Sequence, residues 1–365
     1  MLHRNFFVLC LIYVTTTCGF VSAGEAVINT AAGTGGEENN GDAGAARAMN
    51  IGLPFGVEIG PDGALYITEC LHHRVRRLDR KTGELTTVAG NGQKGWSGDG
   101  GPANAARLDE PYEVRFDKTG NMYFVEMQNH IVRRVDAKTG RISTIAGTGR
   151  AGFGGDGGPA TEARFKVPHS ITLDDDGFLY VADIGNHRIR RIDLDAGTIE
   201  TIAGTGEVRF PADGAKAKGS PLPGPRALAI GGRTLWIVLR EGHSVWKCDL
   251  DEKTLHHVAG TGKAGYSGDG GPAIKATFKG PKGLALGPTG NLFVVDSENE
   301  VIRRIDLATH VVSTVAGSGR TRSYGGDGGD PLKAKFSQPH GICLADDGTI
   351  YIGDTRNHRV RAVSR

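Results

Sequence analysis

The sequence predicts an all-β protein, a closed six-bladed β-propeller of four-stranded antiparallel blades. The first observation is an Ala-Gly pair that recurs at steps of 57, 57, 57, 56 and 57 residues. Its copies are Ala32-Gly33, Ala89-Gly90, Ala146-Gly147, Ala203-Gly204, Ala259-Gly260 and Ala316-Gly317. The second is a loop aspartate that follows nearly the same spacing, with steps of 57, 57, 57, 56 and 58 residues: Asp42, Asp99, Asp156, Asp213, Asp269 and Asp327. The third is the lack of helical periodicity between these markers, which indicates one repeated β unit.

One repeat, residues 146–204, contains four strand-like segments. Residues 170–174 (SITLD) alternate polar and apolar side chains, and residues 178–183 (FLYVAD) are rich in aromatic and β-branched side chains. Residues 187–193 (HRIRRID) and 198–204 (TIETIAG) follow after short Gly, Asn and Asp turns. Four strands with turns at fixed offsets are typical of a propeller blade. Because one such sheet cannot bury both of its faces, neighbouring blades must stack.

The two ends of the chain predict how the ring closes. Residues 25–32 (EAVINTAA) read as a fourth strand without the first three before it. The last repeat stops at Arg365 after its third strand. We expect the N-terminal strand to complete the last blade, which removes exposed sheet edges and ties the termini together.

The first 23 residues predict export. A basic start (MLHRN) precedes the apolar run FFVLCLIYV and a small-residue pattern at Val21-Ser22-Ala23, as in a secretory signal peptide. Residues 24–365 are then a single propeller domain. The rest of the sequence has no apolar stretch long enough for a membrane helix. We therefore expect a monomer without a membrane span in the periplasm or outside the cell.

Composition argues against a disulfide-stabilised fold and against a nucleic-acid-binding protein. Cys70, Cys248 and Cys343, the cysteines that remain after the signal peptide, are odd in number and lie in different repeats, which argues against a disulfide framework. The net charge is +2 and there is no polybasic block, so nucleic acid is not an expected partner.

The segments LYVADIGNHRIRRID and TIYIGDTRNHRVRAV resemble the NHL-repeat family of β-propellers. Its Asn-His signature is clearest at Asn129-His130, Asn186-His187 and Asn357-His358. The glycine-rich loop before each innermost strand is similar to a subset common in exported bacterial proteins. The resemblance implies the fold far more than a function, because such propellers include scaffolds, ligand binders, RNA binders and a few metal-dependent enzymes.

The face that carries the long inter-blade loops is the expected binding face, since the turns on the opposite face are tight. The residue after each repeat's proline opens the innermost strand at the channel mouth. This position varies while the rest of the repeat is uniform: Phe55, Tyr112, His169, Arg226, Lys282 and His340. Such variation favours a specific site, although relaxed constraint gives the same pattern.

Three cations are expected at this mouth on blades four and five. They are Arg226, Lys282 and Arg240. We align Arg240 alone with the acidic residues that end the second strand of the other repeats: Glu69, Glu126, Asp183, Asp296 and Asp354. A guanidinium suits a carboxylate or sulfate, so a small anionic ligand is one interpretation. The other is that Arg240 pairs with a neighbouring acidic strand end.

A metal site is a further hypothesis. His169 and His340 lie in VPHS and QPHG, segments that resemble the zinc-binding strand openings of the peptidyl-hydroxyglycine amidating lyases. The chain has a distant likeness to these lyases and to gluconolactonase-like propellers. In the lyase family the ligands come from alternating blades, whereas these histidines lie three blades apart. Two facing histidines could hold zinc or calcium together with water, or with Asp183 or Asp354, as further ligands. Otherwise the histidines are polar residues of the channel.

The repeated polar positions are better explained by structure. The loop aspartates could form a calcium ring, but a six-fold repeat at equal phase favours turn stabilisation. The aromatic residue three positions earlier, present in five copies, is expected to be a buried plug that pins the loop. We interpret the double arginines, such as Arg190-Arg191, as inter-blade salt-bridge partners and not as a basic surface.

These observations together predict an exported, non-catalytic binding or interaction module with a small anionic ligand or a protein as partner. The alternative is a metal-dependent lyase or lactonase-type hydrolase at the channel mouth.

Overall fold

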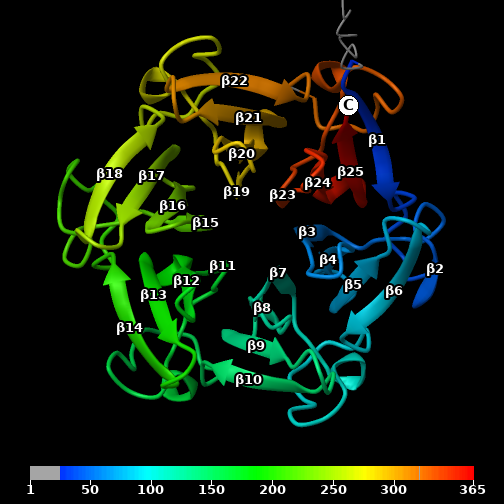
Figure 1. Cartoon of the computed structure of the whole chain (residues 1–365), viewed down its shortest axis with the longest axis horizontal. Coiled ribbons are helices and arrows are strands. Elements are labelled where there is room, and N and C mark those ends of the chain that lie inside the picture. Colours follow the sequence, from blue (N-terminus) through cyan, green and yellow to red (C-terminus); the bar gives the residue numbers. More distant parts are fainter. Residues whose placement is uncertain (1–24, 320) are drawn as a thin grey trace, which may run out of the picture.

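The computed structural model describes residues 25–319 and 321–365, and in this range six antiparallel sheets form a ring (Figure 1). Blade one contains β2(Ala43–Ala45), β3(Pro54–Ile59), β4(Leu65–Glu69), β5(Arg74–Leu78) and β6(Glu84–Ala89). Blade two contains β7(Pro111–Phe116), β8(Met122–Glu126), β9(Ile131–Val135) and β10(Ile142–Ala146). Blade three contains β11(Ser170–Leu173), β12(Phe178–Asp183), β13(Arg188–Asp193) and β14(Thr198–Ala203).

Blade four contains β15(Pro225–Gly231), β16(Thr234–Leu239), β17(Ser244–Asp249) and β18(Thr254–Ala259). Blade five contains β19(Gly283–Leu286), β20(Leu292–Asp296), β21(Val301–Asp306) and β22(Val311–Ala316). Blade six contains β23(Ile342–Leu344), β24(Ile350–Asp354), β25(Arg359–Ser364) and β1(Val27–Ala32). The helical elements are three-residue 3₁₀ turns: η1(Ala103–Ala105), η2(Ala160–Glu162), η3(Ile184–Asn186), η4(Ala273–Lys275), η5(Ser297–Asn299), η6(Pro331–Lys333) and η7(Thr355–Asn357). Within the described residues, no helix is long and apolar enough to cross a membrane.

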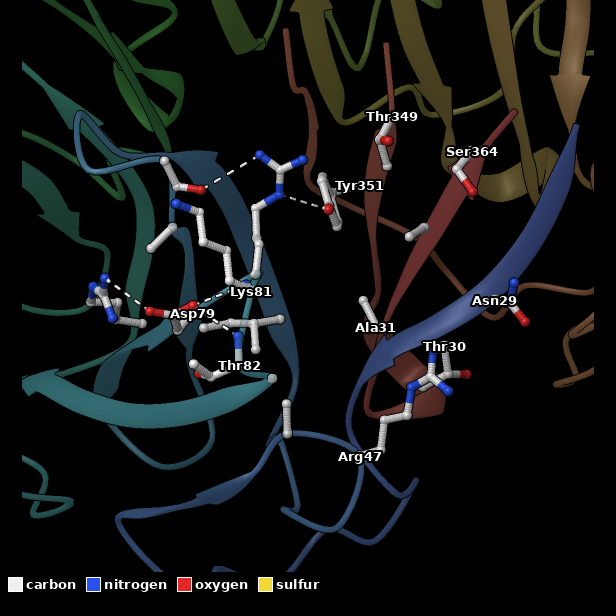
Figure 2. A pocket seen from close by; sticks show the side chains of 18 of the residues that line it. Asn29, Thr30, Ala31, Arg47, Asp79, Lys81, Thr82, Thr349, Tyr351 and Ser364 are labelled. Atoms are coloured by element: carbon white, nitrogen blue, oxygen red, sulfur yellow. Dashed lines mark hydrogen bonds and ion pairs between the residues drawn. The ribbon is translucent and has the colours of Figure 1, made fainter. Parts of the chain in front are cut away.

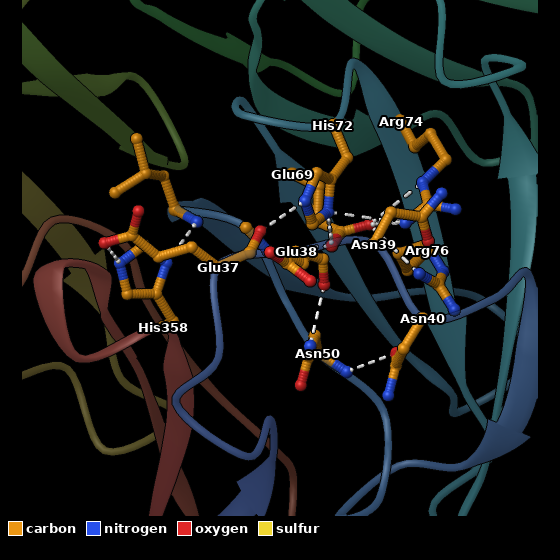
Figure 3. A network of polar contacts seen from close by, with 12 residues as sticks. Glu37, Glu38, Asn39, Asn40, Asn50, Glu69, His72, Arg74, Arg76 and His358 are labelled. Carbon is orange, nitrogen blue, oxygen red and sulfur yellow. Dashed lines mark hydrogen bonds and ion pairs between the residues drawn. The ribbon is translucent and has the colours of Figure 1, made fainter.

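The predicted closure of the ring is confirmed. Strand β1 pairs antiparallel with β25, with Val27 opposite Ser364 and Ile28 opposite Val363 (Figure 1). Ile28 is fully buried in a core cluster that also contains residues of blade five. Polar groups join the last blade to the first: His358 Nε2 lies 3.2 Å from Glu37 Oε1, and His72 contacts both the Glu37 carbonyl and the Glu69 carboxylate (Figure 3). The predicted signal peptide lies outside the described residues.

The glycine-rich loops cover the outer edge of the blades. In blade two, Gly100 N donates to Ile142 O and Ile142 N donates to Gly101 O, so the loop pairs with the outermost strand. Blades three to six repeat this exchange, and in blade one the loop forms the short fifth strand β2. Capping of this kind protects backbone groups that would otherwise template aggregation.

The double arginines act within one blade, which corrects the inter-blade expectation. The first arginine of each pair is fully buried between the acidic end of the second strand and the loop aspartate. In blade five, Arg303 lies 2.8 Å from Asp269 and 3.6 Å from Asp296. Equivalent contacts are made by Arg133, Arg190 and Arg361. In blade one, Arg76 contacts Glu69 and the Asp42 backbone carbonyl, while Arg74 pairs with the Asp42 carboxylate. The loop aspartate is therefore structural, as predicted.

The loop aromatics differ from the prediction, because they are not buried plugs. Trp96, Phe153, Phe210, Tyr266 and Tyr324 are 40–48% exposed. Three of them lie under arginine side chains; the Arg188 guanidinium, for example, is 3.8 Å from the Phe153 ring centroid. The loops are held by aspartate contacts and backbone pairing, so the rings stay at the surface.

The histidine of the Asn-His turn, or the histidine at the equivalent position, links its blade to the next one through a hydrogen bond. It has a left-handed backbone, and its Nδ1 accepts the N–H of the residue before the first proline of the next blade. His130 Nδ1 accepts from Val167 N at 3.2 Å, and His73, His187, His243 and His358 do the same with Glu110, Gly224, Gly280 and Leu53. In blade five, Glu300 Oε2 takes this role toward Gln338 N at 2.6 Å.

Candidate channel-mouth site

Blade four carries a one-residue offset that corrects the alignment of Arg240. Leu239 pairs with Ser244 across β16 and β17, as Asp183 pairs with Arg188 in blade three. Leu239 therefore occupies the acidic position, and Trp246 replaces the buried arginine. Blade four thus has two apolar side chains where the other blades have a buried ion pair. Both charges are absent together, as expected because loss of only one would leave the other charge buried without a partner. Arg240 lies one residue further, beyond the end of the strand.

Four of the six predicted channel-mouth residues form an aromatic cluster. The Phe55 ring lies 4.5 Å from Tyr112 and 4.3 Å from His340, and Tyr112 lies 4.6 Å from His169, centroid to centroid. A glycine allows this approach between blades six and one. A Cβ on Gly341 would lie 2.2 Å from the Phe55 carbonyl oxygen, so a side chain there would force the two innermost strands apart.

Arg226 crosses the channel to join this cluster. It opens β15, yet its guanidinium donates a hydrogen bond to the Tyr112 hydroxyl two blades away and lies 4.8 Å from the centre of that ring. Arg226 is 6% exposed. Within the described part of the chain, no carboxylate forms an ion pair with it. Burial lowers the pKa of Arg226 below its ordinary value.

Lys282 and Arg240 bring further positive charge to the same mouth. Burial, together with the charges on Arg226 and Arg240, lowers the pKa of Lys282 to about 8. Arg240 is more exposed, and its Nη1 pairs with Glu241 at 2.9 Å. The charges of Arg226 and Arg240 thus act on Lys282, and Arg226 is more deeply buried than Arg240.

The two channel histidines share one orientation. His169 Nδ1 lies 2.7 Å from Val167 O, and His340 Nδ1 lies 2.8 Å from Gln338 O. A carbonyl accepts and cannot donate, so each Nδ1 carries the proton and each Nε2 presents a lone pair. Burial, reinforced by the charges on Lys282 and Arg226, lowers the pKa of His340 well below its ordinary value. His340 is therefore neutral near pH 7.

The proposed metal ligands are not brought together. Asp183 and Asp354 are fully buried in the arginine networks of their own blades. Asp183 accepts hydrogen bonds from Lys166 N at 2.8 Å and from Asn186 at 2.7 Å. Across residues 25–319 and 321–365, no three His, Cys, Asp or Glu side chains are placed to share a metal ion. The two histidines are the donors that remain.

A charged cluster deeper in the channel was missed by the sequence analysis. Arg115 on β7 lies 3.1 Å from Glu58 on β3 and 3.2 Å from Glu113. Glu113 also accepts the backbone N–H of Ile171 in blade three. The signal was a pair of charged residues in PYEVRF, at positions where the other innermost strands, apart from Glu58, carry small side chains. This cluster is internally paired and supports the blade contacts.

A hollow lies at the seam between blades six and one (Figure 2). This groove of about 930 Å³ lies between β1 and residues 77–83, at the end of β5 and in the turn that follows it, and contains none of the predicted site residues. Several of its charges are already paired: Arg80 contacts the Tyr351 hydroxyl at 2.9 Å and Asp347 at 2.8 Å, and Arg77 lies 2.6 Å from Asp62.

Comparison with known proteins places these features among propellers. Residues 165–192 and 336–362 match the family model of the NHL repeat. NHL repeat-containing protein 2 of Gallus gallus is 30% identical over 282 residues, which cover 69% of this chain and 38% of that protein. The chain thus spans well under half the length of that relative.

Solved structures show the same fold at low identity. An auxiliary nutrient binding protein from Bacteroides thetaiotaomicron superposes with a TM-score of 0.68 at 17% identity, covering 93% of this chain and 76% of that one. A virginiamycin B lyase from Staphylococcus aureus superposes with a TM-score of 0.51 at 16% identity, covering 88% of this chain and 81% of that one.

Proposed function

The chain belongs to the NHL-repeat β-propellers, and we propose that it is an exported binding module that holds a small anionic ligand at its channel mouth without catalysis. The observation that carries the proposal is Arg226, a buried arginine with a neutral hydrogen-bond partner. Residues 1–23 support export by their signal-peptide pattern. We further propose that the module is a monomer.

Arg226 differs in its partners from the fully buried arginines of the blades, which are paired with carboxylates. Arg133, for example, lies 2.7 Å from both Asp99 and Glu126. Burial of a charge without a partner costs roughly several kcal/mol. We therefore expect a protein to retain a buried, unpaired arginine where a bound molecule supplies the opposite charge. A ligand carboxylate suits a guanidinium, which offers a planar fork of donors. Lys282 adds a second cation next to it.

The surroundings of Arg226 also suit a ligand. The Phe55 and Tyr112 rings lie beside the charge, and apolar rings with a few convergent polar groups are typical of small-molecule sites. A structural neighbour with this fold is described as a nutrient binding protein. That description supports ligand binding as the role of the present propeller.

Binding of small carboxylates to the purified protein tests the proposal. We expect citrate, gluconate or related anions to raise the melting temperature of the wild type and to give a calorimetric binding signal. Arg226→Gln should abolish both effects, and Arg47→Gln, which removes an exposed arginine of the seam groove, should leave them intact. Anion binding that is equal in wild type and Arg226→Gln would refute the site.

The metal-dependent lyase or hydrolase remains the second candidate, because both channel histidines have the orientation common in metal ligands. Their Nδ1–H groups are held by backbone carbonyls, and such contacts fix a metal-binding histidine. Metal analysis of the purified protein distinguishes the two proposals. Stoichiometric zinc or calcium that is lost in His169→Ala would favour the enzyme.

A further inference from the structure

We propose that the ligand is a carboxylate that carries its own hydrogen-bond donors, as a hydroxy acid or a sugar acid does. This inference rests on the proposed anion site and adds what the ligand must present beside its charge. It follows from the two histidine edges that share the channel with Arg226.

The first step is that Nε2 of each histidine, the ring nitrogen farther from the backbone, can accept a hydrogen bond. The Nδ1–H of His169 and of His340 is used by the carbonyl two residues earlier in the chain. Neither Nε2 has a hydrogen-bond partner within the described residues. Each is therefore free to accept a hydrogen bond from a ligand.

The second step is that the site keeps the His340 edge unprotonated. Burial lowers the pKa of His340, and the charges on Lys282, Arg226 and Arg356 oppose a further positive charge there. The mouth thus offers donors on Arg226 and Lys282 and, since both Nδ1–H groups are used by carbonyls, acceptors at Nε2 of the two imidazoles. A ligand that satisfies both must be an acceptor at one end and a donor at the other.

The third step is that one small molecule can touch both parts. Tyr112 contacts the His169 ring at 4.6 Å and lies 4.8 Å from the Arg226 guanidinium, while the His340 ring is 6.4 Å away. A carboxylate at Arg226 is then within a few bonds of either histidine edge. The Tyr112 hydroxyl accepts from Arg226, so its own proton is available to the carboxylate.

The arrangement disfavours anions without donors. Sulfate and simple alkyl carboxylates have no N–H or O–H near pH 7, and they would leave the Nε2 lone pairs unpaired or facing negative charge. Sites built to bond a substrate hydroxyl reject analogues that lack it, because the buried polar groups are left unsatisfied. Selectivity for the hydroxylated acid is therefore the property to measure.

The test compares matched anions by isothermal titration calorimetry on the full protein. Gluconate is set against hexanoate, malate against succinate, and sulfate serves as the anion without donors. We expect each hydroxy acid to bind roughly tenfold or more tightly than its deoxy partner. His169→Asn and His340→Asn keep a side-chain N–H near the Nδ1 position and remove Nε2. Each should weaken the hydroxy acid by about two- to tenfold and leave the deoxy acid unchanged.

The outcomes separate the two proposals. Equal affinity for hydroxy and deoxy acids in the wild type, lost in Arg226→Gln, would overturn the inference and leave the anion site standing. Absence of binding for every anion, or binding that survives Arg226→Gln, would overturn both. Since the wild-type comparison decides by itself, the result does not depend on the folding of the histidine variants.

Discussion

Replacing Arg226 with methionine is expected to stabilise the protein while it abolishes anion binding. Methionine has a similar volume and flexibility, so it can fill the space without a charge. The informative reference is Arg303→Met, which removes an equally buried arginine that has two carboxylate partners. We expect the two substitutions to change stability in opposite directions.

The expected magnitudes follow from the partners of each guanidinium. Loss of Arg303 leaves Asp296 fully buried without its cation, which costs about 3–5 kcal/mol. Loss of Arg226 gives up a cation–π contact of about 0.5–2 kcal/mol and a charged hydrogen bond to Tyr112. It also removes a desolvation cost of several kcal/mol, roughly, together with the repulsion from Lys282. The net expectation is a gain of about 1–2 kcal/mol.

Differential scanning calorimetry of the ligand-free proteins measures this difference. For about 340 folded residues, 1 kcal/mol corresponds to a melting-temperature shift of roughly 1.4 °C. We therefore expect Arg226→Met to melt roughly 1.5–3 °C above the wild type and Arg303→Met to melt below it. If Arg226→Met lowers the melting temperature as far as Arg303→Met does, Arg226 is a structural ion-pair residue and the reasoning fails.

Three further predictions concern the paired arginines, the histidines that accept a hydrogen bond from the next blade, and Lys282. The double substitution Asp296→Leu/Arg303→Met replaces the ion pair by two apolar side chains, as blade four does with Leu239 and Trp246, so denaturant titration should place its unfolding free energy within about 1 kcal/mol of the wild type. His130→Ala removes the acceptor for Val167 N and should cost about 1–2 kcal/mol above pH 6.5. Burial lowers the pKa of His130, so the neutral form stabilises the fold above the ordinary value of 6.5, and this stabilisation is lost as the pH falls through the folded pKa. Anion affinity should fall as the pH rises through about 8, where Lys282 loses its proton, and calorimetry on Lys282→Arg should show a flat profile.

Each of these has a contrary result that is equally clear. A double variant as unstable as Arg303→Met alone would mean that the acid is needed for its other hydrogen bonds. A wild-type-minus-His130→Ala difference that stays constant from pH 8 to pH 5 would exclude the histidine as the titrating group. A pH profile of anion affinity that Lys282→Arg leaves unchanged would assign the titration to another group.

The fold was predictable because its signals are local and repeated. The Ala-Gly and aspartate markers fix a period, and each period contains a complete set of strand and turn preferences. Closure was predictable for the same reason, since residues 25–32 supply the strand that the last repeat lacks. The role of the Asn-His histidine as an inter-blade acceptor was not predicted, because its partner lies 37 residues away on the next blade.

The sequence by itself thus determined the repeat, the number of blades and the set of side chains at the channel mouth. The tertiary structure alone decided what those side chains do, since their partners come from other blades. Arg226 meets Tyr112 across the channel, Asp183 is used by its own arginine, and Arg240 lies one residue beyond the acidic position. Strand preference acts between neighbours in the chain, whereas charge pairing depends on distances that exist after the ring has closed.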